Sequence, residues 1–238
     1  MDTKKRGDLN INGFGSANGG QFHQVTINGK GTVNSDIECV IFDCNGSGTV
    51  NGNVMTNKAK VNGNAKIKGN LECNMLTVDG TVKIENNLKV ENFKVAGKAS
   101  IGGRVKAEEI RIKGRLTVEG DCEADTFKAE SHFMIGGLLT ADHVDIKLFG
   151  ECKAKEIGGQ TILINHKPAL MGLFKHFIQT QLETELIEGD KIELENTKAA
   201  VVRGNQITIG ANCEIGLVEY TDELSVDKKA TVKDSRKV

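Results

Sequence analysis

A repeat of 17 residues runs through more than half of this chain and constrains its fold more than any other feature. Stepping by 17 from Leu76 reaches Phe93 and then Ile110, and other positions of the period match equally well from Val25 onward. One such column holds glycine in six successive periods: Gly29, Gly46, Gly63, Gly80, Gly97 and Gly114. A fixed period of this length indicates a stack of equivalent structural units.

Within one period, apolar residues fall at positions 1 and 3, 7 and 9, and 13 and 15, counted from Leu76. Side chains alternate between the two faces of a strand, so each pair predicts a short strand with two inward side chains. Glycines separate the pairs, often in turn dipeptides such as Asn28-Gly29, and we expect left-handed backbone there. Three short sides per period describe one coil of a triangular parallel β-helix. A hairpin meander is the weaker alternative, because the spacing does not drift.

Stacking is what makes such a coil stable. Each coil presents about six inward side chains, and burying a large one contributes roughly 1.5–3 kcal/mol, which is comparable with the entropy lost on ordering the coil. Stability therefore requires neighbouring coils about 4.8 Å apart. The first coil is one residue shorter, since Leu9 and Ile11 match Val25 and Ile27 at an offset of 16.

The repeat is lost after Ile164 and resumes near Ile192. Pro168 and the apolar spacing that follows it predict a helical or irregular insert. The predicted organisation is a disordered tail over 1–8, a main rod over 9–164, the insert over 165–189, a second short β-helical block over 190–232 and a tail over 233–238. Four apolar residues of the insert are expected to form either a lid on the rod or a membrane contact: Leu170, Phe174, Phe177 and Ile178.

Composition excludes several classes of protein. The 31 basic and 32 acidic residues give a net charge of −1, which offers no basis for nucleic-acid binding. No run of 18 apolar residues is present, so no membrane span is expected. The first residues are polar and lack an apolar signal segment, which predicts a cytoplasmic protein.

Residues that could carry chemistry do not form a recognisable constellation. The six cysteines contain no C-x-x-C pair and fall at inward positions, so we expect buried thiols and no metal site. Hexapeptide-repeat acyltransferases are also β-helices with a histidine base, but their coils repeat strictly in sixes, whereas this period divides as 6, 6 and 5. No phosphate-binding G-x-x-x-x-G-K-[ST] loop occurs. The sequence therefore predicts no catalytic residues, no cofactor and no small-molecule substrate.

The pattern resembles that of the bactofilins, bacterial proteins that form a polymeric cytoskeleton. The resemblance rests on apolar-x-apolar-x-Gly steps such as Val25-Thr26-Ile27-Asn28-Gly29 and on Thr49-Val50-Asn51-Gly52-Asn53-Val54. It implies an all-β, right-handed parallel β-helix that associates end to end into filaments without nucleotide. The insert and the second block depart from the usual single core.

Two surfaces are candidates for assembly. An uncapped β-helix ends in apolar side chains and unpaired strand edges, which are a template for another copy. The residues expected at these ends are Leu9, Ile11, Phe14 and Phe22 at the start and Leu224, Val226 and Val232 near the finish. Two columns of opposite charge form either a self-compensating solvated edge or an ionic partner surface: Lys94, Arg111 and Lys128, with Glu91, Glu108 and Asp125.

These observations favour a non-enzymatic scaffold that forms a homopolymer. The resemblance to the bactofilins implies that such a scaffold supports cell shape, motility or the positioning of other proteins. A non-polymerising β-helical binding module is the alternative, and an acyltransferase is a weaker one. The expected partners are further copies of the chain, a related bactofilin or the periphery of a membrane.

Overall fold

The computed structural model describes residues 6–166 and 180–238, and within these residues the regular structure consists of strands, with no helix. Neighbouring strands pair in parallel, so the predicted all-β, parallel β-helical class is confirmed. The chain divides into two compact units, Met1–Glu109 with Gly114–Val118, and Ile110–Lys113 with Glu119–Val238.

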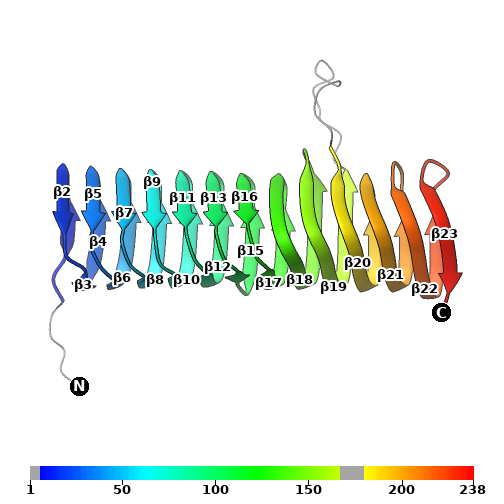
Figure 1. The fold of residues 1–238 in the computed structure, drawn as a ribbon, viewed down its shortest axis with the longest axis horizontal. Helices are drawn as coiled ribbons and strands as arrows, with labels where there is room; N and C mark the ends of the chain where they lie inside the picture. The colour runs from blue at the N-terminus through cyan, green and yellow to red at the C-terminus, as the bar shows by residue number, and fades with distance from the viewer. Residues whose placement is uncertain (1–5, 167–179) are drawn as a thin grey trace, which may run out of the picture. The chain divides into compact units, whose positions relative to one another are not determined.

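The first unit is a parallel β-solenoid whose strands stack coil upon coil (Figure 1). Leu71 pairs with Leu88 and Leu76 with Phe93, which gives the predicted 17-residue register, and Leu9 pairs with Val25 in the shorter first coil. Its strands are β1 (Leu9–Ile11), β2 (Phe14–Ala17), β3 (Gly20–Gln21), β4 (Gln24–Ile27), β5 (Lys30–Val33), β6 (Ile37–Cys44), β7 (Ser47–Val50), β8 (Val54–Val61), β9 (Asn64–Ile67), β10 (Leu71–Val78), β11 (Thr81–Ile84), β12 (Leu88–Val95), β13 (Lys98–Ile101), β14 (Val105–Lys106) and β16 (Arg115–Val118).

The six inward positions of the period form the core of this unit. In the coil that follows Leu76, each of the six side chains is at most 4% exposed: Val82, Ile84, Leu88, Val90, Phe93 and Val95. The residues between them point outward and are polar, as Lys83 and Lys94 illustrate. The predicted alternation between inward and outward side chains is therefore confirmed.

The glycine column has a different cause from the one expected. Among the described residues, the glycine with a left-handed φ is Gly20 (145°), which lies outside that column. A Cβ atom at Gly80 would instead lie 2.1 Å from the carbonyl oxygen of Gly63 in the preceding coil, and Gly46, Gly63 and Gly97 meet the same obstacle. The corner is occupied by glycine because adjacent coils approach too closely there for any side chain.

Asparagine side chains reinforce the corner next to these glycines. The Nδ2 atom of each asparagine donates to the Oδ1 atom of the one a coil earlier, from Asn28 to Asn12 (2.9 Å), Asn45 to Asn28 (2.9 Å) and Asn62 to Asn45 (2.7 Å). The Asn-Gly dipeptides thus serve the stacking of coils, whereas in a hairpin they would reverse the chain.

The second unit is also a parallel β-solenoid. Its strands are β15 (Glu109–Ile112, of which Glu109 belongs to the first unit), β17 (Cys122–Ala129), β18 (His132–Leu148), β19 (Cys152–His166), β20 (Leu182–Leu194), β21 (Thr197–Ile209), β22 (Glu214–Val226) and β23 (Thr231–Lys237). Coil length varies here: Phe127 pairs with Val144 at an offset of 17, Val144 with Ile162 at 18 and Leu182 with Thr197 at 15.

The stacking corrects the predicted separation into a rod over 9–164 and a block over 190–232. Strand β19 pairs directly with β20, with Cys152 opposite Leu182 and Ile164 opposite Leu194. Parallel pairing therefore continues from β19 to β20 across the break in the repeat. Strand β20 begins at Leu182, inside the range assigned to the insert. Strand β23 likewise includes most of the predicted C-terminal tail, because its backbone pairs with β22.

The four insert residues predicted as a lid or membrane contact, Leu170, Phe174, Phe177 and Ile178, lie outside the described residues.

Candidate assembly surfaces

The first coil of the first unit has an apolar interior, and among residues 6–166 and 180–238 no further coil covers its outer side. Val25 and Ile27 of the second coil are fully buried, whereas Leu9 is half-buried and Ile11 is 8% exposed. The residues from Leu9 to Gly29 include no aspartate, glutamate, lysine or arginine. The coil itself is therefore uncharged and its strands have one unpaired edge, although Arg6 and Asp8 lie beside it and the His23 amide donates to the Gly7 carbonyl.

The two aromatic residues of this coil occupy different positions. Phe22 is half-buried and continues the inward column that contains Cys39, which is 5% exposed. Phe14 is 91% exposed and pairs with Lys30, so it stands on the lateral face of the solenoid. The structure brings Leu9, Ile11 and Phe22 to the open end and places Phe14 beside it.

The last coil of the second unit has a comparable apolar end. Ile207 and Ile209 are buried, whereas their partners in the last coil are not: Leu224 is half-buried and Val226 is 45% exposed. Val232, opposite the buried Ile215, is also half-buried. Unlike the first coil, this one is rich in charge, with Asp222, Glu223 and Asp227 followed by Lys228, Lys229, Lys233, Asp234, Arg236 and Lys237.

A column of alternating charge leads to this end. Glu188, Arg203, Glu219 and Arg236 are in register on four successive strands. The Arg203 side chain donates to Glu188 (2.9 Å) and to Glu219 (2.7 Å), and Arg236 donates to Glu219 through Nε (2.8 Å). The hydrogen bonds from Arg236 and Arg203 hold the pKa of the Glu219 carboxyl below its usual value. The offsets between these residues are not a constant 17, so the repeat did not reveal them.

The residues of the two predicted charge columns are exposed, with Lys94, Glu91 and Glu108 in the first unit and Arg111, Lys128 and Asp125 in the second. Glu91 accepts a hydrogen bond from the Asn74 amide of the preceding coil at 2.9 Å. Ion pairs between coils also form at other positions, as between Lys89 and Glu72 at 2.6 Å.

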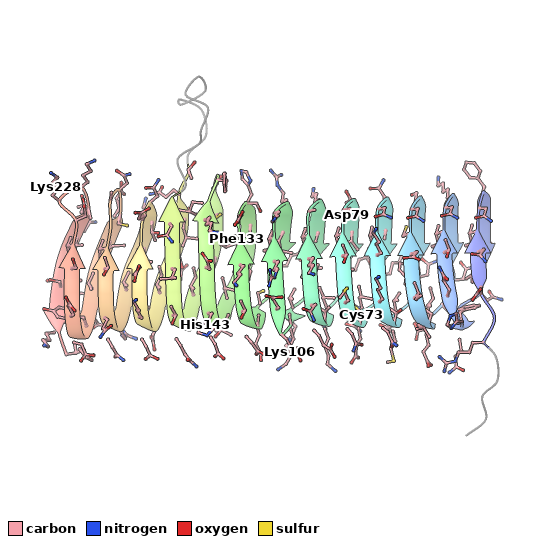
Figure 2. The ribbon with its side chains drawn as sticks, turned by 180° about the vertical axis from the view of Figure 1, so that it is seen from behind. Cys73, Asp79, Lys106, Phe133, His143 and Lys228 are labelled. Carbon is pink, nitrogen blue, oxygen red and sulfur yellow. The ribbon has the colours of Figure 1, made fainter. Side chains whose placement is uncertain are left out.

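Sequence reasoning missed a groove of about 690 Å³ along the first unit. Its floor consists of small inward residues, which include Cys39, Thr56 and Cys73, and its walls carry charged side chains such as Glu108 and Lys106. Figure 2 shows Cys73 and Lys106 toward the same long edge of the ribbon. Small residues at position 15 of the period were the signal for it, because they fill less of the interior than the residues at position 13.

The cysteines behave as core side chains. All six are buried and free, and burial raises the pKa of Cys44 to about 11 and that of Cys73 to about 12. A thiol that resists ionisation is a poor nucleophile and a poor metal ligand. In the part of the chain that the structure describes, no three histidine, cysteine, aspartate or glutamate residues are grouped to hold a metal ion.

Among residues 6–166 and 180–238, no helix has the length and apolar character needed to cross a membrane.

Fold and surfaces together define a parallel β-solenoid protein with an uncovered apolar coil at each end of its described chain. A family model described as "Bactofilin: Polymer-forming cytoskeletal" matches residues 2–89. The uncharacterized protein YhbE of Bacillus subtilis (strain 168) is 59% identical over 239 residues, which cover all of both chains. The uncharacterized protein YhbF of the same organism is 35% identical over 103 residues, or 43% of this chain and 42% of YhbF. No solved structure matches. The chain belongs to the bactofilin family, a structural, polymer-forming cytoskeletal family.

Proposed function

We propose that this protein is a non-enzymatic cytoskeletal scaffold whose copies join through their terminal coils into filaments. The observation that carries the proposal is the increase in solvent exposure of apolar residues toward both ends. Val25 is fully buried whereas its partner Leu9 is half-buried, and Ile209 is buried whereas its partner Val226 is 45% exposed. Burying these residues against another copy removes apolar surface from water and pairs the open strand edges. Family membership supports the same conclusion. Negative-stain microscopy of the purified protein tests it, and a monodisperse protein without filaments would contradict it.

The two ends favour different kinds of joint. The uncharged first coil suits a contact between two identical ends, related by twofold symmetry, in which each copy covers the other. The charged last coil offers a second joint in which acidic and basic side chains of two copies face each other. Filament growth requires both joints, because the first alone yields dimers.

Replacing Phe22 with arginine is expected to abolish the joint at the first coil, because the guanidinium would lie at a desolvated contact without a partner. The matched control is Phe14→Arg, which makes the same substitution in the same coil on the lateral face, where the side chain is 91% exposed. Size-exclusion chromatography with light scattering measures the result. Folded Phe22→Arg protein that assembles as the wild type does would place the joint elsewhere.

Assembly is expected to be independent of ATP and GTP, since no phosphate-binding loop exists, and to depend on salt at the charged surfaces. The uncharged coil from Leu9 predicts that its joint withstands high salt, so that filaments shorten toward dimers. Light scattering across a salt series, with and without nucleotide, checks both statements. Nucleotide hydrolysis coupled to polymerisation would contradict the first.

The groove of the first unit supports a second candidate function, a β-helical module that positions a partner without polymerising. The charged residues Glu91, Glu108 and Lys94 are part of the ionic partner surface in this alternative. Negative-stain images that show monomers and no filaments, in samples where a partner protein remains bound to the monomer, would favour this function.

We further propose a cytoplasmic location, with assembly supporting cell shape, motility or the placement of other proteins, and with a related bactofilin as a copolymer. The six free, buried cysteines suit a reducing compartment. The insert residues Leu170, Phe174, Phe177 and Ile178 are proposed as a lid or a membrane contact on the strength of their apolar spacing.

A further inference from the structure

One lateral face of the first unit carries a concentration of positive charge. Strands β2, β5, β7, β9, β11, β13 and β16 form a row of neighbouring strands (Figure 1), joined by parallel pairs such as Phe14 with Lys30 and Lys98 with Arg115. The strand residues and the residue that follows each strand supply six bases and two acids: Lys30, Lys66, Lys68, Lys83, Lys98 and Arg115, with Glu85 and with Glu119, which follows β16. We call this surface the basic face.

The rest of the first unit does not share this excess. The groove side, formed by positions 12 to 16 of the coils, carries five acids and three bases: Asp36, Glu38, Glu72, Glu91 and Glu108, with Lys89, Arg104 and Lys106. The remaining side is balanced, with three of each: Asp43, Asp79 and Glu109, with Lys58, Lys60 and Lys94. The near-zero net charge of the chain therefore conceals a polarised unit.

Like charges are stacked on the basic face. Lys66 and Lys83 are direct partners on β9 and β11, and Lys98 and Arg115 are direct partners on β13 and β16. Directly opposed like charges on neighbouring strands are destabilising. The Lys66 ammonium pairs with Glu85 at 2.8 Å, whereas no salt bridge joins the other five bases to an acid among residues 6–166 and 180–238. An anionic surface laid against this face would relieve the repulsion.

An exposed aromatic side chain shares the basic face. Phe14 precedes Lys30 in the same outward column and is 91% exposed. Basic side chains combined with a projecting aromatic residue are the chemistry of proteins that lie on anionic bilayers, where the ring enters the interfacial layer. A nucleic-acid partner would explain the lysines but gives no reason for an isolated phenylalanine on a sheet that is otherwise polar.

We propose that the basic face is a docking surface for an anionic phospholipid bilayer. A row of seven strands spans about 29 Å at a spacing of about 4.8 Å, so its bases meet several headgroups at once. Each lysine or arginine near an anionic surface contributes about 1 kcal/mol. Phe14 belongs to the first coil, but the six bases of this surface lie outside the terminal coils, so binding to the bilayer does not require polymerisation, although polymerisation would strengthen the attachment by avidity.

Flotation of the full chain with vesicles tests the proposal, because filaments sediment while vesicle-bound protein rises. We expect flotation with vesicles of equal parts phosphatidylglycerol and phosphatidylcholine, and none with phosphatidylcholine alone. The triple variant Lys68→Glu, Lys83→Glu and Lys98→Glu should bind at least about 100-fold more weakly, as three lost contacts of this size predict. Phe14→Ser should also reduce flotation, without any change in charge.

The matched control is Lys58→Glu, Lys60→Glu and Lys94→Glu, which changes the net charge equally on the balanced side. It should float nearly as the wild type does, and circular dichroism should show both triple variants folded. Equal losses in the two triples, or flotation that is insensitive to the basic face, would overturn the proposal. So would tighter binding of a labelled DNA duplex than of the vesicles. Negative-stain images without vesicles separate this outcome from a failure of filament assembly.

Discussion

Replacing Ile112 with aspartate is expected to unfold the coil to which it belongs, with a loss of more than about 4 kcal/mol in the free energy of unfolding. Ile112 is 1% exposed on β15 and fills an inward position of the repeat. Truncating a buried isoleucine alone costs about 2–5 kcal/mol, and the carboxylate adds the penalty of burying a charge without a partner. For a protein of ordinary stability, this removes much of the margin that keeps it folded.

The neighbouring substitution Arg111→Asp provides the control, since it introduces the same side chain one residue away on the outer surface. We expect it to change the free energy of unfolding by about 1 kcal/mol or less, the range of exposed ion pairs. Chemical denaturation followed by circular dichroism measures both. Similar losses in the two variants would contradict the assignment of inward and outward positions.

Replacing Gly80 with alanine is expected to destabilise the first unit by about 3 kcal/mol, at the upper end of overpacking costs. The added Cβ would lie 2.1 Å from the Gly63 carbonyl oxygen and 2.4 Å from that of Asn62. Both obstacles are backbone atoms, so no side-chain rotation relieves the overlap. The coils would have to separate, which would weaken the hydrogen bond from the Gly80 amide to the Val61 carbonyl, now 3.0 Å long.

Gly13→Ala is the matched control for this result. Gly13 occupies the same corner in the first described coil, and its added Cβ meets no atom within 4 Å. We expect a change within about 0.5 kcal/mol, as for an ordinary surface substitution. If Gly13→Ala and Gly80→Ala lower the melting temperature equally, the glycines are required for turn conformation and not for coil spacing.

The period of the sequence by itself determined the architecture of the coil. Inward positions such as Val82 and Phe93, the outward residues between them and the shorter first coil were all predictable, because a period-two alternation within a fixed repeat leaves only one consistent stack. The partial exposure of Leu9 and Leu224 in the outermost described coils was predictable for the same reason. The family resemblance was likewise carried by these repeated steps.

Only the tertiary structure decided which residues from different coils lie side by side where the spacing changes. Strand β19 pairs directly with β20, although the insert separates them in the sequence. The charged column from Glu188 to Arg236 likewise joins coils of unequal length. The role of Gly80 was also hidden, because a glycine that avoids a neighbouring coil and one that turns the chain look alike in sequence. The basic face appears only when outward positions from seven strands are placed on one surface. Surfaces are set by distances between coils, and a sequence encodes those distances only as far as its repeat stays regular.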